Sequence, residues 1–214
     1  METKRFDIIT EADARVIEPG TTVGLAAGGH VTPLADDTLR ARRVTVLREN
    51  GVPPETARAL VPAADVRRVA VGSDHTGLDL KAYLVAALRA RGLAAVDVGT
   101  LDKTPVDYPD VAAAVGRAVI HGEAEAGIVI DGSGLGSAIA ANKLRGIRAV
   151  MCTTPTLARY AREHNGANVL ALGSTLLAPA DALGIVDTFL TTPMREPRYI
   201  ARLAKIRALE ASGR

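Results

Sequence analysis

The sequence contains no tryptophan, and its aromatic residues are limited to four tyrosines and two phenylalanines. The core must therefore be aliphatic, which suits the close-packed layers of an α/β fold. The single cysteine, Cys152, excludes an intrachain disulfide and fits a reducing compartment. No apolar run reaches the length of a membrane-spanning helix, and METKRFDIIT lacks the apolar stretch of a secretory signal. We therefore expect a cytoplasmic protein without a membrane partner.

A large excess of charge of one sign is also lacking. The formal net charge of +2 is too small to indicate a nucleic-acid partner. The function must be sought in local motifs rather than in a charged surface or an anchor.

Short apolar segments and amphipathic segments alternate from Arg67 to the end of the chain. The apolar segments predict strands at 69–72, 94–98, 128–130, 147–152 and 169–172. The amphipathic segments predict helices at 78–91, 111–121, 137–146, 155–164, 180–190 and 198–211. This alternation predicts a doubly wound, Rossmann-like α/β domain over residues 67–214, with a parallel five-stranded sheet and helices on both faces.

The first 49 residues predict a small N-terminal extension of unknown role. We expect strands at 21–25 and 43–48, a turn at Gly28–His30, and a helix at 33–42 with Thr32 as its N-cap. Because apolar residues are few, we expect this unit to lack its own core and to dock on another surface. Residues 50–66, with three prolines, predict a linker with a short helix at 55–60.

One stretch, IVIDGSGLGSAIAANK (128–143), combines several signals for a site. An apolar strand ends at Asp131, and glycines alternate with other residues before a helical pattern begins. Glycines let the backbone approach a ligand, and the N–H groups at a helix start suit an anion or a developing oxyanion. In a parallel sheet such loops meet at the carboxyl ends of the strands, so Asp74, His75, Asp131 and Ser133 should share one crevice.

The GxGxG spacing of this stretch is neither the GxGxxG of dinucleotide-binding folds nor a P-loop, which ends in GK[ST]. A nucleotide-binding domain is therefore disfavoured. A tight turn that only connects strand to helix remains an alternative.

Six blocks occur at the expected strand ends, loops and C-terminal helix: GSDHTGLDLK (72–81), DVGT (97–100), VDYPD (106–110), IDGSGLGSAIAANKLRGIRA (130–149), REHNGANVLALG (162–173) and RYIARLAKI (198–206). Together they resemble the ribose-5-phosphate isomerase B and galactose-6-phosphate isomerase family. The resemblance covers residues 67–210 and leaves out 1–65. It implies an enzyme that interconverts phosphorylated aldoses and ketoses through a cis-enediolate, without a metal or other cofactor.

The resemblance also implies a role for each matched residue. His164 corresponds to the histidine that opens the sugar ring, and Asn165 to a neighbour that contacts the substrate or the enediolate. Asp74 and His75 correspond to a pair that binds sugar hydroxyls or phosphate. Tyr108 corresponds to the aromatic residue of a nearby loop.

Two further groups complete the implied site. Arg198 and Arg202, four residues apart on one helix face, correspond to phosphate-binding arginines. Ser133 and the amides of Gly132, Gly134 and Gly136 correspond to the anion-stabilising loop. In the family these residues come from two subunits, which implies a homodimer with shared active sites, or a tetramer.

The chain departs from the family pattern at the base. Many members have cysteine at the position of Asp131, and another branch uses a glutamate at the position of Ser137. Asp131 is the obvious substitute, although a carboxylate near its ordinary pKa of about 3.9 is a weak base. Alternatively, Asp131 only binds a sugar hydroxyl or caps the following helix. Cys152 is more typical of a small buried hydrophobe than of a replacement thiol.

Ribose 5-phosphate and ribulose 5-phosphate are the default substrate pair that the resemblance implies. Another tetrose, pentose or hexose phosphate of a catabolic pathway is an alternative, because the base is altered. A non-catalytic sugar-phosphate-binding module is a second alternative. Each group of matched residues also has an interpretation without a functional role. The arginines could form a solvated helix face, the histidines could be structural loop residues, and Tyr108 could be a packing residue.

Overall fold

The computed structural model describes residues 4–48, 59–63, 65–194 and 196–212. These residues form a three-stranded sheet near the N-terminus and a five-stranded sheet in the rest of the chain. Within the described ranges, no helix has both the length and the apolar character that a membrane span requires.

The five-stranded sheet confirms the expected Rossmann-like fold. Its strands are all parallel, in the order β5-β4-β6-β8-β7. Their bounds are β4 (Arg68–Ser73), β5 (Ala94–Asp97), β6 (Ala126–Asp131), β7 (Ala149–Met151) and β8 (Val169–Gly173). The central strands β6 and β8 are buried at every residue, as expected for parallel strands covered on both faces.

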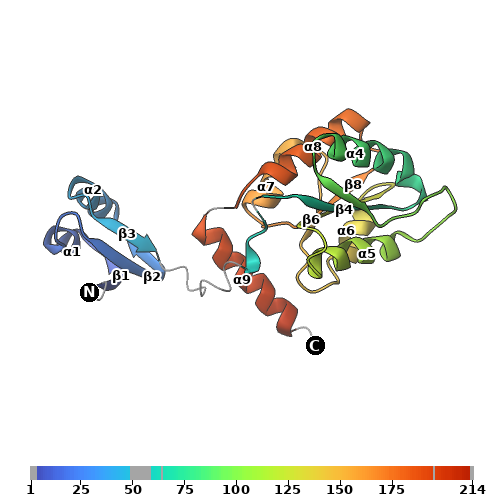
Figure 1. Cartoon of the computed structure of the whole chain (residues 1–214). Coiled ribbons are helices and arrows are strands. Elements are labelled where there is room, and N and C mark those ends of the chain that lie inside the picture. Colours follow the sequence, from blue (N-terminus) through green and yellow to red (C-terminus); the bar gives the residue numbers. More distant parts are fainter. Residues whose placement is uncertain (1–3, 49–58, 64, 195, 213–214) are drawn as a thin grey trace.

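Helices cover both faces of this sheet (Figure 1). One face carries α4 (Leu78–Ala90), α7 (Pro155–Glu163) and α8 (Pro179–Thr191). The other carries α5 (Tyr108–Ile120) and α6 (Leu135–Ala141). The last helix, α9 (Pro197–Ser212), runs beside the segment that precedes β4. Apart from Phe189, the buried residues of both clusters are aliphatic or cysteine, as the composition predicts.

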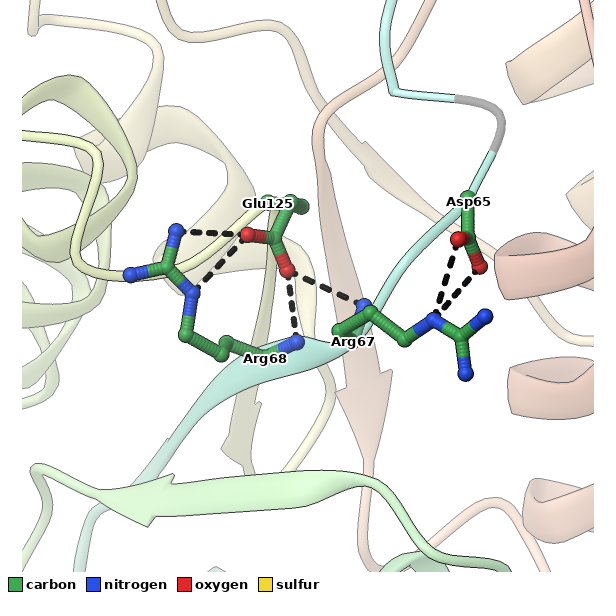
Figure 2. A network of polar contacts seen from close by, with 4 residues as sticks. All are labelled: Asp65, Arg67, Arg68 and Glu125. Atoms are coloured by element: carbon green, nitrogen blue, oxygen red, sulfur yellow. Dashed lines mark hydrogen bonds and ion pairs between the residues drawn. The ribbon is translucent and has the colours of Figure 1, made fainter.

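A carboxylate fixes the point where the chain enters the sheet (Figure 2). Glu125 Oε2 accepts hydrogen bonds from the amides of Arg67 (3.0 Å) and Arg68 (2.6 Å), and Oε1 accepts from Arg68 Nε (2.9 Å). Burial opposes ionisation of Glu125, but these bonds outweigh it and lower its pKa. Asp65 also pairs with Arg67 at 2.9 Å. Because Glu125 directly precedes β6, the contact ties the start of β4 to the start of β6.

The N-terminal unit is a small parallel sheet with two helices. It consists of β1 (Arg5–Ile9), α1 (Glu11–Val16), β2 (Thr22–Val31), α2 (Pro33–Ala41) and β3 (Thr45–Arg48), and its strand order is β1-β2-β3. The turn expected at Gly28–His30 is wrong, because β2 continues through it, with His30 paired to Ile8 of β1.

The expected lack of a core in this unit is also wrong. Ile9, Leu25 and Leu39 are at most 2% exposed and belong to a hydrophobic cluster within the unit. The elements β1 and α1, which the sequence patterns did not reveal, supply part of that cluster. A missing core therefore gives no reason for the unit to dock elsewhere.

The end of the expected linker is packed against the main domain. Leu60 is 5% exposed, and Pro62 is buried. The rest of the linker, and most of the short helix expected at 55–60, lie outside the described residues.

Candidate active site

The loops that follow β4, β6 and β8 hold one another at the carboxyl edge of the sheet. The amide of Asp74 donates to the carbonyl of Ile130 (3.1 Å), and the amide of Ser174 donates to the carbonyl of Asp131 (2.8 Å). Thr175 Oγ1 donates to the carbonyl of Gly132 at 2.6 Å. The structure therefore brings Asp74, Asp131 and the glycine loop 132–136 together, as the rule for parallel sheets predicts.

Asp131 is the last residue of β6, and its carboxylate is turned into the glycine loop. It is 4% exposed. Oδ1 accepts hydrogen bonds from the amides of Ser133 (2.7 Å) and Gly134, and Oδ2 accepts from the amide of Ser137 (2.9 Å). Burial opposes ionisation, but the bonds from Ser137, Gly134 and Ser133 outweigh it, so the pKa of Asp131 lies below its ordinary value. These contacts favour the capping alternative over the base.

The bonds to Asp131 also decide which loop amides are free. The amides of Ser133, Gly134 and Ser137 are occupied by the carboxylate. Among the described residues, the amides of Gly132 and Gly136 donate to no acceptor. The Ser133 hydroxyl donates to Asp131 Oδ1 at 3.5 Å. The loop therefore offers the N–H groups of Gly132 and Gly136 to a bound oxyanion.

Tyr108, the first residue of α5, packs on the glycine loop. A Cβ atom on Gly136 would lie 2.6 Å from Cζ of the Tyr108 ring, so glycine is required for this contact. The ring is still 41% exposed, which leaves part of it open to a substrate.

Asp74 and His75 belong to the loop after β4. Asp74 is 6% exposed. Its Oδ1 accepts hydrogen bonds from the Thr76 amide (2.9 Å), Thr76 Oγ1 (2.6 Å) and the Gly77 amide (3.1 Å). Its Oδ2 accepts none among the described residues. His75 Nδ1 accepts from the Val106 amide at 3.3 Å, which joins this loop to the segment before Tyr108.

Lys81, which was not predicted as a site residue, anchors the turn after β5. Lys81 is 2% exposed, and its ammonium donates to Asp97 Oδ1 (2.7 Å) and to the carbonyl of Thr100. Lys81 and Asp97 lie in two of the matched blocks, and this was the only signal for their pairing. The bond holds the DVGT turn near the site.

A second cluster forms around His164. The His164 ring lies between Tyr160, at 4.8 Å between ring centroids and 15° between planes, and Tyr199, at 4.5 Å and 36°. The guanidinium carbons of Arg198 and Arg202 lie 4.8 and 5.5 Å from the centroid of the Tyr199 ring. The structure therefore brings His164, Arg198 and Arg202 together through Tyr199.

The two tyrosines of this stacked cluster were not predicted as site residues. Tyr199 is 8% exposed, and Arg198 Nη2 donates to its hydroxyl at 3.1 Å. The adjacent Asn165 is exposed, and its side-chain amide donates to the carbonyl of Tyr160 at 3.0 Å. The His164 side chain is 33% exposed and thus accessible to a ligand.

Within one chain, the two clusters lie at opposite ends of the strands: the glycine loop at the carboxyl ends and the stacked cluster at the amino ends. His164 and Asn165 precede β8, which begins at Val169, and Val169 pairs with Gly127 of β6. Asp131 lies four residues further along β6 and pairs with Gly173. At about 3.3 Å per residue, this separates the two clusters by at least ~13 Å. The resemblance implies active sites that two subunits share, and within one chain the structure keeps these two groups of residues apart.

The remaining candidates for reactive groups are few. No set of three or more His, Cys, Asp or Glu side chains suited to a metal occurs within the described ranges. Cys152 is fully buried, and burial raises the pKa of its thiol to about 11.

Comparisons with known proteins place this site in a family. The model of the Ribose/Galactose Isomerase family matches residues 69–206. Ribose-5-phosphate isomerase B of Escherichia coli (strain K12) is 43% identical over 145 residues, which are 68% of this chain and 97% of that protein.

Comparison with solved structures gives the same family. Clostridium thermocellum ribose-5-phosphate isomerase B superposes with a TM-score of 0.66 at 46% identity, over 67% of this chain and 97% of that one. The Mycoplasma genitalium ribose-5-phosphate isomerase B, solved with bound ribulose 5-phosphate, gives 0.65 at 35% identity, over 68% and 97%. From the glycine loop, the stacked cluster and these matches, we conclude that the chain belongs to the ribose/galactose isomerase family of sugar-phosphate isomerases.

Proposed function

We propose that this protein interconverts ribose 5-phosphate and ribulose 5-phosphate by proton transfer between C1 and C2 through a cis-enediolate. The relatives described above are ribose-5-phosphate isomerases. The observation that carries the proposal is the stacked cluster, because it places a histidine beside two arginines on one aromatic ring. A histidine can move the proton that opens a sugar ring, and paired guanidinium groups suit a phosphate.

The glycine loop supplies the second function, which is to stabilise the enediolate. The N–H groups of Gly132 and Gly136 are the donors that we assign to the developing oxyanion. Preorganised donors of this kind lower the barrier because they need no reorganisation during the reaction. Asp131 holds the loop in this shape through its own three amide bonds.

We assign the base to Asp74 rather than to Asp131. Protonation of Asp131 would sacrifice the hydrogen bonds that lower its pKa, so it is poorly suited to accept a proton. Asp74 is equally buried and lies at the same edge, but its Oδ2 accepts no hydrogen bond from the described residues. It therefore has an oxygen available to a substrate proton. The opposite assignment, with Asp131 as the base, is the outcome that would contradict this one.

The complete site requires two copies of the chain. A five-carbon sugar phosphate is shorter than the separation of the two clusters, so the carboxyl edge of one copy must meet the stacked cluster of another. Exposed apolar residues flank both clusters: Leu135 (58%) and Ile139 (63%) on α6, and Leu157 (45%) on α7. Covering these side chains is a driving force for a homodimer, or for a tetramer built from dimers.

The proposal is tested by a coupled isomerase assay on four-, five- and six-carbon sugar phosphates, with the unmodified chain, Asp74→Asn and Asp131→Asn. We expect turnover of ribose 5-phosphate, a loss of at least about 10²-fold in kcat for Asp74→Asn, and a smaller loss for folded Asp131→Asn. If kcat falls more in folded Asp131→Asn than in Asp74→Asn, the base is Asp131 and not Asp74.

Other outcomes of the same assay identify the alternatives. Turnover of a different sugar alone would mean that the substrate assignment is wrong while the reaction class holds. Binding of sugar phosphates without turnover of any of them would indicate the non-catalytic module.

A further inference from the structure

The segment Leu60–Ala63, here called the pre-strand segment, packs against the turn that follows His164. Leu60 is 5% exposed and forms a hydrophobic cluster with Met194, Tyr199 and Leu203. Pro62 Cδ would lie 3.5 Å from a Cβ atom on Gly166, two residues after His164. The pre-strand segment therefore shares a buried cluster with Tyr199 and packs against the turn that follows His164.

Two arginines bridge the pre-strand segment to this turn. Arg148 donates to the carbonyls of Leu60 (2.8 Å) and Gly166 (2.7 Å). Arg162 donates to the carbonyls of Ala63 (2.7 Å) and Ala167 (2.9 Å). Each guanidinium thus uses one donor on the pre-strand segment and one on the turn after His164.

Burial of these two arginines opposes their charged form, and a linker without a structural role would not need it. Arg162 is fully buried, and burial, together with nearby Arg148, lowers its pKa to about 10. Neither arginine forms an ion pair with a carboxylate among the described residues. The Arg162 guanidinium bonds two carbonyl oxygens and lies 5.1 Å from the centroid of the Phe189 ring, while its Nε has no partner among the described residues. A buried cation with such partners is unfavourable unless its geometry is needed. The geometry that Arg162 enforces here is the position of the pre-strand segment against the turn after His164.

We propose that Leu60 is a positioning residue for the phosphate-binding and ring-opening cluster, acting through Tyr199. This inference rests on the proposed function and adds a part that the family match, which begins at residue 69, does not include. Leu60 packs in the same buried cluster as Tyr199, and the Tyr199 ring contacts Arg198, Arg202 and His164. Without the Leu60 side chain, the ring can tilt and the two guanidinium groups lose their common support.

The consequence should be a change in phosphate binding larger than the change in turnover. Two arginines that share one ring are preorganised for a phosphate, so loosening them weakens binding before it affects proton transfer at the other edge. A purely structural role for Leu60 would lower the melting temperature without this separation of KM from kcat.

The test uses Leu60→Ala in the full chain, with Leu88→Ala as the matched control. Leu88 is fully buried in the cluster on the α4 face and is not part of either half of the site. Steady-state kinetics on ribose 5-phosphate and calorimetric titration with inorganic phosphate give the readouts. We expect Leu60→Ala to raise KM and the phosphate Kd about tenfold, with kcat reduced less than about threefold. Leu88→Ala should lower the melting temperature but leave the phosphate Kd unchanged.

A conservative variant and a second contact complete the design. Leu60→Met, which refills most of the space, should restore the phosphate Kd to the parental value. Arg148→Lys, which keeps the charge but has a single ammonium in place of a planar fork, should raise the Kd even if Leu60→Ala fails to fold.

An unchanged Kd in Leu60→Ala or Arg148→Lys, or an equal rise in Leu88→Ala, would overturn the inference. The phosphate titration does not depend on turnover. It therefore decides the inference even if the unmodified chain isomerises no sugar, which would overturn the proposed function instead.

Discussion

Tyr199 packs its ring against the imidazole of His164, with 4.5 Å between the ring centroids, and carries Arg198 and Arg202 on the same ring. A side chain absent from the expected catalytic set therefore connects the group assigned to ring opening with the groups assigned to phosphate binding. The ring and the hydroxyl of Tyr199 can be tested separately.

Replacing Tyr199 should separate the contribution of its ring from that of its hydroxyl. Tyr199→Phe keeps the stack and loses only the bond from Arg198 Nη2, so we expect a rise in KM of about two- to fivefold. Tyr199→Ala removes the support of all three side chains, and kcat/KM should fall by about 10²-fold. Steady-state kinetics on the two variants measure this, and equal effects of both would exclude a role for the ring.

Two glycines of the loop should differ sharply in their tolerance of alanine. Gly134 has a φ of +79°, and a Cβ atom there would lie 2.9 Å from the backbone of Leu172. We expect Gly134→Ala to lower the free energy of unfolding by about 2 kcal/mol or more. In the matched variant Gly132→Ala, the new Cβ atom would have only Thr76 Oγ1 within 4 Å, at 3.7 Å. We expect this variant to change the free energy of unfolding by less than about 0.5 kcal/mol. Denaturant unfolding of both variants provides the comparison.

The depressed pKa of Asp131 predicts a pH-dependent contribution to stability. The folded-state pKa lies below the unfolded value, so the stabilisation is complete above the unfolded pKa and is lost as pH falls toward the folded one. Asp131→Asn should be less stable than the parent by about 1–3 kcal/mol at neutral pH, because the new amide N–H groups face backbone donors. The difference should shrink below about pH 4. A difference independent of pH would mean that the carboxylate charge contributes nothing to the loop.

Cys152 should be dispensable. Because burial raises the pKa of its thiol to about 11, it should not react with a thiol reagent at pH 8 until the protein unfolds. Cys152→Ala should retain turnover on the same sugar as the parent. Rapid labelling of the folded protein, or loss of turnover in folded Cys152→Ala, would reopen the question of a replacement thiol.

The main domain could be predicted closely from the sequence because its buried parallel strands are continuous apolar runs. Ile128–Ile130 is an example, although β6 extends from Ala126 to Asp131. The N-terminal unit was predicted poorly. Its first strand, RFDII, has charged residues at two of five positions, and β2 contains the Gly-Gly pair that normally indicates a turn.

The candidate site residues were identified through their motifs, and their arrangement was predicted only in part. The resemblance implied that His164 and Asp131 belong to an active site shared by two subunits, but the sequence did not show how far apart they lie within one chain. It also could not reveal that Asp131 would turn both oxygens toward the amides of its own loop. Leu60 was interpreted as a linker residue and Arg162 as a helix residue. The bond from Arg162 to Ala63 and the cluster that contains Leu60 are formed only by tertiary packing.

The separation of the two clusters at opposite sheet edges has a consequence for mixtures of defective chains. In a twofold pair, we expect Asp74→Asn to disable the proposed base in its own copy, and Arg202→Ala to disable the proposed phosphate site in its own copy. A mixed pair then contains one doubly defective site and one site with both halves intact. If subunits exchange freely, two inactive proteins should together recover about a quarter of the normal activity, since half the pairs are mixed and each has one working site.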